Sequence, residues 1–402
     1  MMPHRISRSL LLLAVLVVFP FSASAIVTID ADNPLLQYFG RFDFSVPKSP
    51  RFDWPGTSIQ ARFTGPSLSI MLSGGTNDFN VIIDGVFQSH LVLQNGITTY
   101  NVATSLADVE HTLLLTKRTE GFNGIATFSG MLLADGKNLV ALPPRNFQKL
   151  QFIGDSFTVG YGDEANVLSC PDRRPYDNNY MAYGPLTARA LNAEYSVQAV
   201  SGAGMIHNYG DANPVSAQPL PFFFNRTLFG NATPTWNFAS WIPDLVVIAL
   251  GTNDFSTAVK PSQAQYTNAY KAFITSVRGY FPGVQILCMT YAVDSFQGPY
   301  VATMVQDLTT QGDTRIHTVS MPALLMSDLG CDYHPNLSGQ QKYADALLPV
   351  VRQYLPTIAV DWMRGRSNRR QGFTRNRNSV TGSFAIPGTD HWMDVRGRIL
   401  GR

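Results

Sequence analysis

The sequence has few charged residues and few cysteines, and it has no long hydrophobic run after its first 25 residues. Of its 402 residues, 14% are charged and 45% are hydrophobic, and the formal net charge is +2. Nine arginines and two aspartates fall within residues 364–402, so the rest of the mature chain is mildly acidic. The hydrophobic fraction excludes an intrinsically disordered protein, and an acidic body argues against nucleic acid as a partner.

The three cysteines, Cys170, Cys288 and Cys331, are too few for a disulfide-stapled module. In an oxidising compartment they allow one bridge and one free thiol, and the sequence leaves all three pairings open. The sequence contains no Cys-x-x-Cys and no His-x-x-x-His motif, so no structural zinc site is expected. We expect neither a metal nor an organic cofactor.

Residues 1–25 have the pattern of a secretory signal peptide. Basic residues precede an apolar run at 10–19, and small residues at 23–25 offer a cleavage site. A membrane anchor is the alternative, but about ten apolar residues are too few for a hydrocarbon core of roughly 30 Å. We therefore expect a secreted chain that starts at Ile26 and has no membrane span. Three acceptors of N-glycosylation would fit export if the host glycosylates: Asn225, Asn231 and Asn336.

The mature chain divides by composition into four parts. Residues 26–142 show short alternating strands between glycine turns, which predicts an all-β sandwich. Within them, Asp84-Gly85 lies between two apolar runs and indicates a hairpin. Residues 143–146 begin with two prolines and form a linker. An α/β domain is expected at 147–358. The composition of residues 359–402 predicts a disordered basic tail, and the alternative is a segment that anchors the chain to an anionic surface.

Strand and helix patterns alternate five times in the α/β domain. The expected strands are 149–153, 195–200, 244–250, 284–289 and 316–321. The expected helices begin at 186, 262 and 339, and Ser338 is the expected cap of the last one. This alternation predicts a three-layer α/β/α domain with a five-stranded parallel sheet, whose function lies at the carboxyl ends of the strands.

Short polar motifs follow four of these segments. They are Gly154-Asp155-Ser156, Ser201-Gly202-Ala203-Gly204, Gly251-Thr252-Asn253-Asp254 and Asp332-Tyr333-His334-Pro335. A parallel sheet brings all four to one edge, as nucleophilic acyl transfer requires. Ser156 is the expected nucleophile and His334 its base. The backbone N–H groups of Ser156 and Gly202 and the amide of Asn253 are the expected oxyanion donors. Each motif alone is a turn or a cap, whereas the ordered set predicts a catalytic site.

The set of motifs resembles that of the SGNH (GDS-type) hydrolases, and the chain lacks the Gly-x-Ser-x-Gly elbow of ordinary α/β-hydrolases. Residues 152–162, Trp54-Pro55-Gly56 and the 117–120 Lys-Arg-Thr-Glu segment are further similar to carbohydrate esterase family 2. The resemblance covers residues 35–355. It implies an N-terminal jelly roll, an SGNH catalytic domain, and removal of O-acetyl groups from polysaccharides such as acetylated xylan and glucomannan.

One departure from the SGNH pattern concerns the acid of the triad. The usual position, three before the histidine, is Cys331 here, and Asp332 is two before. The sequence leaves two ways to orient His334: by the side chain of Asp332, or by the Cys331 carbonyl, as in a Ser–His dyad. In the second case Asp332 is only a surface acid or a helix-capping acid. Tyr333 and Tyr161 are candidates for stacking on a sugar ring, and Tyr161 could equally be core.

Two other functions stay open at this point. One is a non-catalytic polysaccharide-binding protein that uses the β-sandwich. The other is an esterase or acyltransferase for lipid-like esters, for which residues 219–224 are the only candidate lid.

Trp54 is expected in the core of the β-domain, and Glu120 is a candidate for the domain interface.

Overall fold

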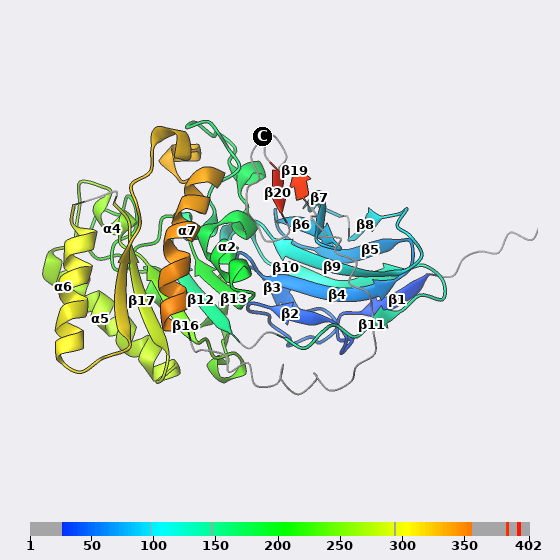
Figure 1. Ribbon diagram of the computed structural model, residues 1–402, viewed down its shortest axis with the longest axis horizontal. Helices are drawn as coiled ribbons and strands as arrows, with labels where there is room; N and C mark the ends of the chain where they lie inside the picture. The colour runs from blue at the N-terminus through cyan, green and yellow to red at the C-terminus, as the bar shows by residue number, and fades with distance from the viewer. Residues whose placement is uncertain are drawn as a thin grey trace, which may run out of the picture.

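The computed structural model describes residues 26–96, 98–145, 148–292 and 295–355, with the backbone of 383–385 and 392–394. The predicted signal peptide (1–25), the end of the linker and nearly all of the predicted tail lie outside the described residues. Figure 1 shows two bodies side by side, one built of β-strands and one of a sheet flanked by helices. None of the helices in the described ranges is long and apolar enough to cross a membrane.

The N-terminal body is a sandwich of two antiparallel sheets. The first sheet has the order β1 (Val27–Asp30), β10 (Ala126–Leu133), β5 (Leu68–Ser73) and β8 (Thr99–Ala103), with β3 (Arg51–Phe52) beside β10. The second has the order β11 (Leu139–Val140), β4 (Ser58–Thr64), β9 (Glu110–Lys117), β6 (Asp78–Ile83) and β7 (Val86–Val92), with β2 (Gln37–Phe39) beside β4. The predicted β-sandwich is confirmed. Asp84 and Gly85 make the expected turn, both with positive φ.

Alternation of side chains explains how the sandwich closes. In β5, Leu68, Ile70 and Leu72 are buried while the residues between them are only partly covered. Their buried faces join one core cluster with strands of the second sheet, including Phe63 and Phe79. Each strand therefore gives one face to the shared core, which is the pattern that period-two sequences predict.

The C-terminal body is a doubly wound α/β domain. Its sheet has the order β13 (Glu194–Ala199), β12 (Lys149–Gly154), β16 (Leu245–Ala249), β17 (Gln285–Thr290) and β18 (Ile316–Ser320), all parallel. The expected five-stranded parallel sheet is confirmed. The chain leaves β12 toward β13 and leaves β16 toward β17, so the winding reverses between β12 and β16. Sites of open α/β sheets lie at such a reversal, at the carboxyl ends of the strands.

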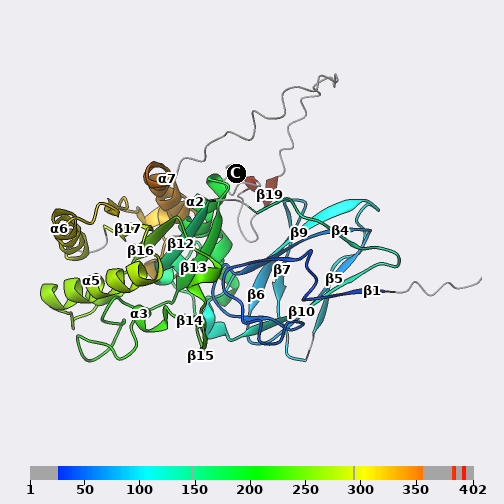
Figure 2. The same cartoon turned by 90° about the horizontal axis from the view of Figure 1, so that it is seen from below.

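Helices cover both faces of this sheet (Figure 2). They are α1 (Ser156–Val159), α2 (Tyr183–Ala190), α3 (Leu220–Phe223), α4 (Thr252–Phe255), α5 (Gln263–Tyr280), α6 (Gln297–Thr310) and α7 (Leu337–Tyr354). Val246 and Ile248 of β16 pack toward α5 and α6, whereas Val247 packs toward α2 and α7. A fully buried strand serves both layers in this way, which is why its sequence is continuously apolar.

Short elements complete the described chain. They are the 3₁₀ turns η1 (Gly121–Asn123), η2 (Arg174–Tyr176), η3 (Asn179–Met181), η4 (Phe238–Ser240), η5 (Met326–Asp328) and η6 (Cys331–Tyr333), the pair β14 (Arg226–Leu228) and β15 (Asn231–Thr235), and the pair β19 (Ser383–Ala385) and β20 (Trp392–Asp394). The last pair falls within the stretch expected to be a tail and lies near β7 (Figure 1).

The start of α7 corrects two expectations. Its cap is Asn336, not Ser338, because the Asn336 Oδ1 accepts from the N–H groups of Ser338 (3.0 Å) and Gly339 (3.2 Å). Asn336 is also buried, and its Nδ2 donates to the carbonyls of Ser327 and Leu329. A glycan on Nδ2 would displace these two bonds and would not fit at a buried side chain, so Asn336 is not a usable acceptor in the folded chain.

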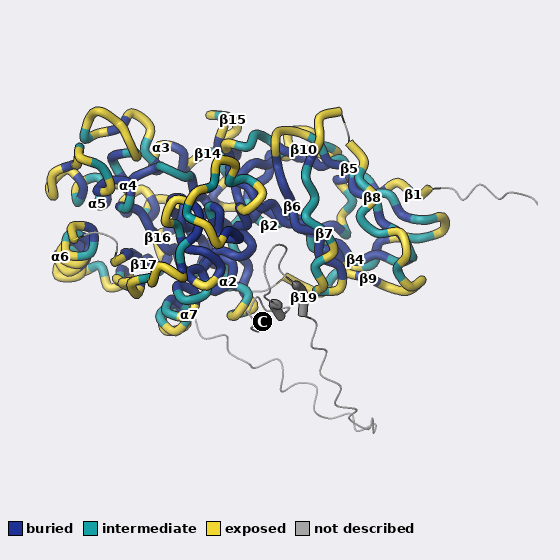
Figure 3. Tube along the Cα trace, turned by 90° about the horizontal axis from the view of Figure 1, so that it is seen from above, coloured by how far each residue is buried: buried dark blue, intermediate teal, exposed yellow. Residues whose placement is uncertain are grey.

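The two bodies share a buried junction. Figure 3 shows buried chain in both interiors and where they meet, with exposed residues mostly on outer loops. Trp54 is fully buried there, but it packs with the core of the α/β domain and donates from Nε1 to the Thr227 carbonyl at 3.0 Å. The expectation that Trp54 belongs to the β-domain core is therefore wrong, since its ring crosses the junction.

Candidate active site

The nucleophile candidate stands at the end of β12. Asp155 caps α1, with its Oδ1 accepting from the Phe157 N–H at 3.1 Å, so Ser156 becomes the first residue of the helix. A side chain at Gly154 would collide with the Thr158 hydroxyl, which explains the glycine before the aspartate. Ser156 is almost fully buried, at 6% exposure. Its hydroxyl is thus fixed at the carboxyl edge of the sheet.

The base candidate directly follows the turn η6, 178 residues later. His334 Nε2 lies 2.7 Å from Ser156 Oγ, so the structure brings together the two residues that the sequence paired. On the other side of the ring, Nδ1 lies 3.1 Å from both the Cys331 and Asp332 carbonyl oxygens. Carbonyls only accept, so Nδ1 carries the proton and Nε2 is left as an acceptor for the serine proton.

The carboxylate of Asp332 does not touch His334. It is exposed and accepts a hydrogen bond from the Tyr161 hydroxyl at 2.7 Å. Of the alternatives left open by the sequence, the structure therefore favours orientation by backbone carbonyls, those of both Cys331 and Asp332. Two successive residues in the left-handed region, Asp332 (φ 50°) and Tyr333 (φ 61°), fold the turn so that both carbonyls face the ring.

Burial sets the protonation of the base. Loss of water around the imidazole lowers the pKa of His334 to about 4, against a smaller opposing effect of its two carbonyl partners. The imidazole is consequently neutral over most of the acid and neutral range. A neutral imidazole with its free nitrogen on the serine is the form that general-base chemistry needs.

The loop after β13 lies at the same edge of the sheet as Ser156, since Gly154 pairs with Ala199 and the Val200 N–H donates to the Gly154 carbonyl at 3.2 Å. Gly202 has φ +78°, a conformation that favours glycine. In the described part of the chain, the N–H groups of Gly202 and Ser156 have no protein acceptor, so both stay available as donors. Asn253 Nδ2 donates to the Ala203 carbonyl at 2.9 Å, which ties the third expected oxyanion residue to the same loop.

A residue without a role in the sequence-based prediction holds this loop in place. The Asp254 carboxylate accepts from three successive N–H groups, those of Met205 (2.8 Å), Ile206 (2.9 Å) and His207 (2.9 Å). Asp254 is the last residue of the Gly-Thr-Asn-Asp motif, so the sequence indicated that it follows a strand. Its three hydrogen-bond partners could not be predicted, because the fold brings them to it. Burial raises the pKa of Asp254, and the three backbone donors oppose that shift.

The one bridge is Cys170–Cys331, and Cys288 is a buried free thiol. The sequence left this pairing open. Cys331 supplies a carbonyl to His334, so the disulfide ties the histidine turn to the segment before η2. Burial raises the pKa of the Cys288 thiol to about 12, which keeps it protonated and unreactive.

The two tyrosines differ in what they can contact. The Tyr161 ring stacks on His334 at 4.1 Å, and the guanidinium of Arg173 lies 4.0 Å from its centroid. Two groups at that distance cannot share a face, so both faces of Tyr161 are covered. The expectation of a sugar platform at Tyr161 is therefore wrong. Tyr333, which is 62% exposed, remains open to a sugar ring.

The candidate lid is part of the core. Residues 219–224 include α3, and Leu220, Phe223 and Phe224 are buried in the cluster beneath α5. Phe222 alone of these phenylalanines is exposed. The hypothesis of an esterase or acyltransferase for lipid-like esters therefore loses its only candidate lid. Within the described ranges, no group of three or more His, Cys, Asp or Glu residues is placed to hold a metal ion.

A serine–histidine pair at the winding reversal of a doubly wound sheet, beside a glycine loop and a buried asparagine, defines the class: an SGNH hydrolase behind a β-sandwich. The family model "Carbohydrate esterase 2 N-terminal" matches residues 38–143, and "GDSL-like Lipase/Acylhydrolase family" matches residues 152–342. The chain belongs to carbohydrate esterase family 2.

Similar proteins agree with this assignment. An acetylxylan esterase / glucomannan deacetylase of Cellvibrio japonicus is 30% identical over 349 residues, covering 82% of this chain and 94% of that protein. The cellulase/esterase CelE of Acetivibrio thermocellus is 35% identical over 337 residues, and the chain spans 40% of that relative's length. A family two esterase from Clostridium thermocellum, solved with cellohexaose, has a TM-score of 0.74 and 32% identity over 79% of this chain and 98% of that one.

Proposed function

We propose that this chain is a secreted serine esterase that removes O-acetyl groups from polysaccharides of the acetylxylan and glucomannan type. The observation that carries the proposal is the 2.7 Å contact between His334 Nε2 and Ser156 Oγ, with the Nδ1 proton fixed by two carbonyls. The substrate class rests on the relatives, two of which are named acetylxylan esterase / glucomannan deacetylase.

The geometry supports a two-step acyl transfer. His334 takes the Ser156 proton as Oγ attacks the acetyl carbonyl, and the tetrahedral intermediate collapses when His334 returns the proton to the sugar oxygen. This leaves an acetyl group on Ser156. A water molecule then gives its proton to His334 and attacks the ester, which releases acetate and restores the hydroxyl.

The negative oxygen of the intermediate needs donors that are in place beforehand. The N–H groups of Ser156 and Gly202 are free for this. The third donor we assign is Asn253 Nδ2, which in this structure donates to the Ala203 carbonyl (2.9 Å) and lies 3.5 Å from Asp155 Oδ2. Loss of one such donor costs about 2.7–4 kcal/mol of transition-state stabilisation. Tyr333, exposed one residue before the base, is positioned to pack on the sugar that carries the acetyl group.

Export is part of the proposal and has two supports. The first 25 residues have the pattern of a signal peptide, although they lie outside the described residues. The structure also pairs Cys170 with Cys331, and such bridges persist in oxidising compartments. The remaining acceptor asparagines differ in access: Asn225 is exposed and Asn231 is partly buried at the start of β15.

The test is acetate release from acetylated xylan and acetylated glucomannan by the mature protein and by Ser156→Ala. The wild type should release acetate and the variant should not, whereas equal release by both would remove Ser156 as the nucleophile. Retention of the variant on the same polysaccharides then shows whether binding persists without catalysis. Comparison of acetyl with longer acyl esters of one chromogenic alcohol checks the preference for acetate.

A further inference from the structure

A segment of the β-sandwich enters the α/β domain beside the candidate active site. It consists of residues 117–120, at the end of β9, and all four are fully buried. Lys117 Nζ donates to the carbonyls of Thr119 (2.6 Å) and Glu120 (3.0 Å), which fixes the turn that follows the strand. The side chain of Glu120 is thereby delivered to the neighbouring domain on a rigid support.

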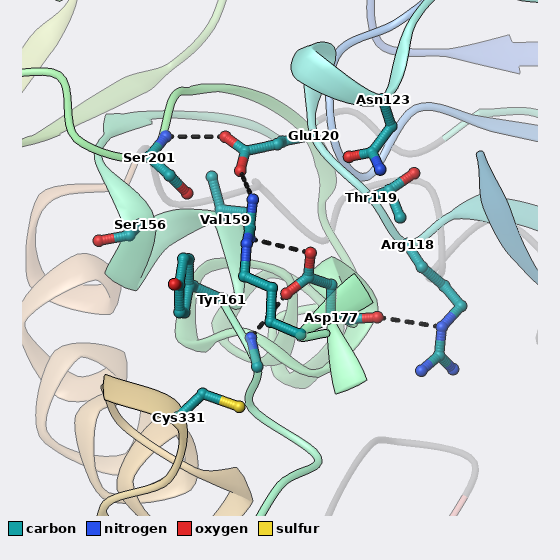
Figure 4. A network of polar contacts seen from close by, with 12 residues as sticks. Arg118, Thr119, Glu120, Asn123, Ser156, Val159, Tyr161, Asp177, Ser201 and Cys331 are labelled. Atoms are coloured by element: carbon teal, nitrogen blue, oxygen red, sulfur yellow. Dashed lines mark hydrogen bonds and ion pairs between the residues drawn. The ribbon is translucent and has the colours of Figure 1, made fainter. Parts of the chain in front are cut away.

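Each carboxylate oxygen of Glu120 has its own partner there (Figure 4). Oε2 accepts from the Ser201 N–H at 2.8 Å, and Oε1 forms an ion pair with Arg173. Ser201 directly precedes Gly202, whose free N–H is a candidate oxyanion donor. A charged acceptor on the preceding amide therefore sets the orientation of the loop that presents Gly202.

Arg173 extends this contact to the other half of the site. Its Nη1 donates to Asp177 Oδ2 at 2.9 Å, and its guanidinium lies 4.0 Å from the Tyr161 centroid. The opposite face of Tyr161 stacks on His334 at 4.1 Å. Glu120 is thus linked by direct contact to the glycine loop and, through Arg173 and Tyr161, to the base.

We propose that Glu120 is a positioning residue of the esterase reaction, so that the β-sandwich contributes a part of the active site and not only a separate module. The inference rests on the proposed function. Catalytic groups displaced by about 1 Å can lose on the order of 10²-fold in rate. The Glu120 carboxylate comes from outside the α/β domain. It holds the loop before Gly202 directly and His334 through Arg173 and Tyr161, so it sets the positions of both catalytic elements.

The test compares Glu120→Gln with Glu164→Gln, using a chromogenic acetate that contains no sugar. Glutamine has the volume of glutamate, but its amide N–H₂ would face one of the two groups that donate to the carboxylate, the Ser201 N–H or the Arg173 guanidinium. Glu164 is the matched control, because it is also buried at the junction and paired with an arginine, Arg118, yet it contacts neither Ser201 nor Arg173. Active sites are counted by stoichiometric phosphonylation of Ser156 with a p-nitrophenyl alkylphosphonate.

In Glu120→Gln, kcat per titrated site should fall about 10- to 100-fold, while KM changes by less than about threefold. In Glu164→Gln, kcat per titrated site should stay close to wild type even where the melting temperature drops. A Glu120→Gln protein with wild-type kcat per titrated site would overturn the proposal and leave Glu120 a structural residue. An equal loss of kcat in both variants would overturn it too.

A second variant covers the case in which Glu120→Gln does not fold. Arg173→Lys keeps the positive charge beside Glu120, but an ammonium cannot bridge Glu120 and Asp177 while lying flat on Tyr161. We expect a fall of about 5- to 10-fold in kcat per titrated site, and no change would again contradict the proposal. A wild type that hydrolyses the chromogenic acetate but no acetylated polysaccharide would refute the proposed substrate and leave the role of Glu120 standing.

Discussion

The base of this site is held by neutral groups. His334 donates from Nδ1 toward two backbone carbonyls, and the nearest carboxylate, that of Asp332, is occupied by the Tyr161 hydroxyl. A carbonyl stabilises the imidazolium less than a carboxylate does, which costs some transition-state stabilisation. Burial outweighs the opposing effect of these carbonyls on the pKa of His334 and keeps the imidazole neutral in acid. His334 can therefore act as a base over a wide pH range.

The pH profile follows from this shift. The pKa of His334 is lowered to about 4, so the imidazole gains its proton, and ceases to be a base, only as the pH falls through that value. We expect kcat/KM for a chromogenic acetate to be nearly level from pH 7 down to pH 5 and to decline through an acid limb near pH 4. An acid limb near the ordinary imidazole pKa of about 6.5 would contradict this.

Substitution of Asp332 separates its side chain from its carbonyl. Asp332→Asn keeps the left-handed backbone, which asparagine tolerates, and keeps an acceptor for Tyr161. We expect kcat to fall by less than about 10-fold, against the roughly 10⁴-fold loss that follows removal of a triad carboxylate.

The control for this substitution is Tyr161→Phe, which removes the hydrogen bond that Asp332→Asn keeps and retains the ring that stacks on His334. The two variants should behave alike in steady-state assays. A loss near 10⁴-fold in Asp332→Asn alone would restore the carboxylate as the triad acid.

At the scale of elements, the histidine turn is the strained piece of the site. η6 contains two non-glycine residues with positive φ, each costing about 1–3 kcal/mol, and such turns persist where neighbours fix them. Here the fixing contacts are the Cys170–Cys331 bridge, the bond from Asp332 N–H to the Leu168 carbonyl (2.8 Å), and that from Gly330 N–H to the His334 carbonyl (2.7 Å). The sequence showed the turn, and the fold supplied its anchors.

Removing the bridge should affect both stability and rate. The paired variant Cys170→Ser/Cys331→Ser opens a connection between residues 161 apart, so we expect the free energy of unfolding to fall by about 2–5 kcal/mol. We also expect a lower kcat, because the turn that orients His334 loses one of its anchors. Urea denaturation and steady-state assays measure the two effects.

The wild type in the presence of a reductant is the control for this pair. It should approach the behaviour of the double variant, while the double variant itself should not respond to reductant. A double variant with unchanged stability and unchanged rate would show that the bridge supports neither the fold nor the turn.

At the scale of the whole molecule, the two domains form one working unit. Fully buried residues of the β-sandwich contact the α/β domain through charged groups: Arg118 donates to the Asp177 carbonyl (3.0 Å) and pairs with Glu164, and Glu120 reaches Ser201. Buried charges are costly unless each is paired and hydrogen-bonded. Separation of the domains would leave these groups without partners, so we expect the domains to unfold together.

Arg118→Met tests this coupling. It leaves Glu164 without its arginine in a buried site, so the free energy of unfolding should fall by about 3–5 kcal/mol. In Arg62→Met, the loss of the exposed pair with Glu110 should cost about 0–1 kcal/mol. Unfolding followed by tryptophan fluorescence and by circular dichroism should give one coincident transition in the wild type. Two separate transitions, or equal costs in the two variants, would show that the domains are independent.

The sequence by itself determined the two domain types, the five parallel strands and the pairing of Ser156 with His334, because these depend on local periodicity and on the rule that parallel strands end at one edge. Only the tertiary structure decided that carbonyls orient His334, that Cys170 pairs with Cys331, that Trp54 crosses the junction, and that Arg173 covers Tyr161. Those contacts join residues distant along the chain, and their geometry arises from packing between elements, which no local pattern encodes.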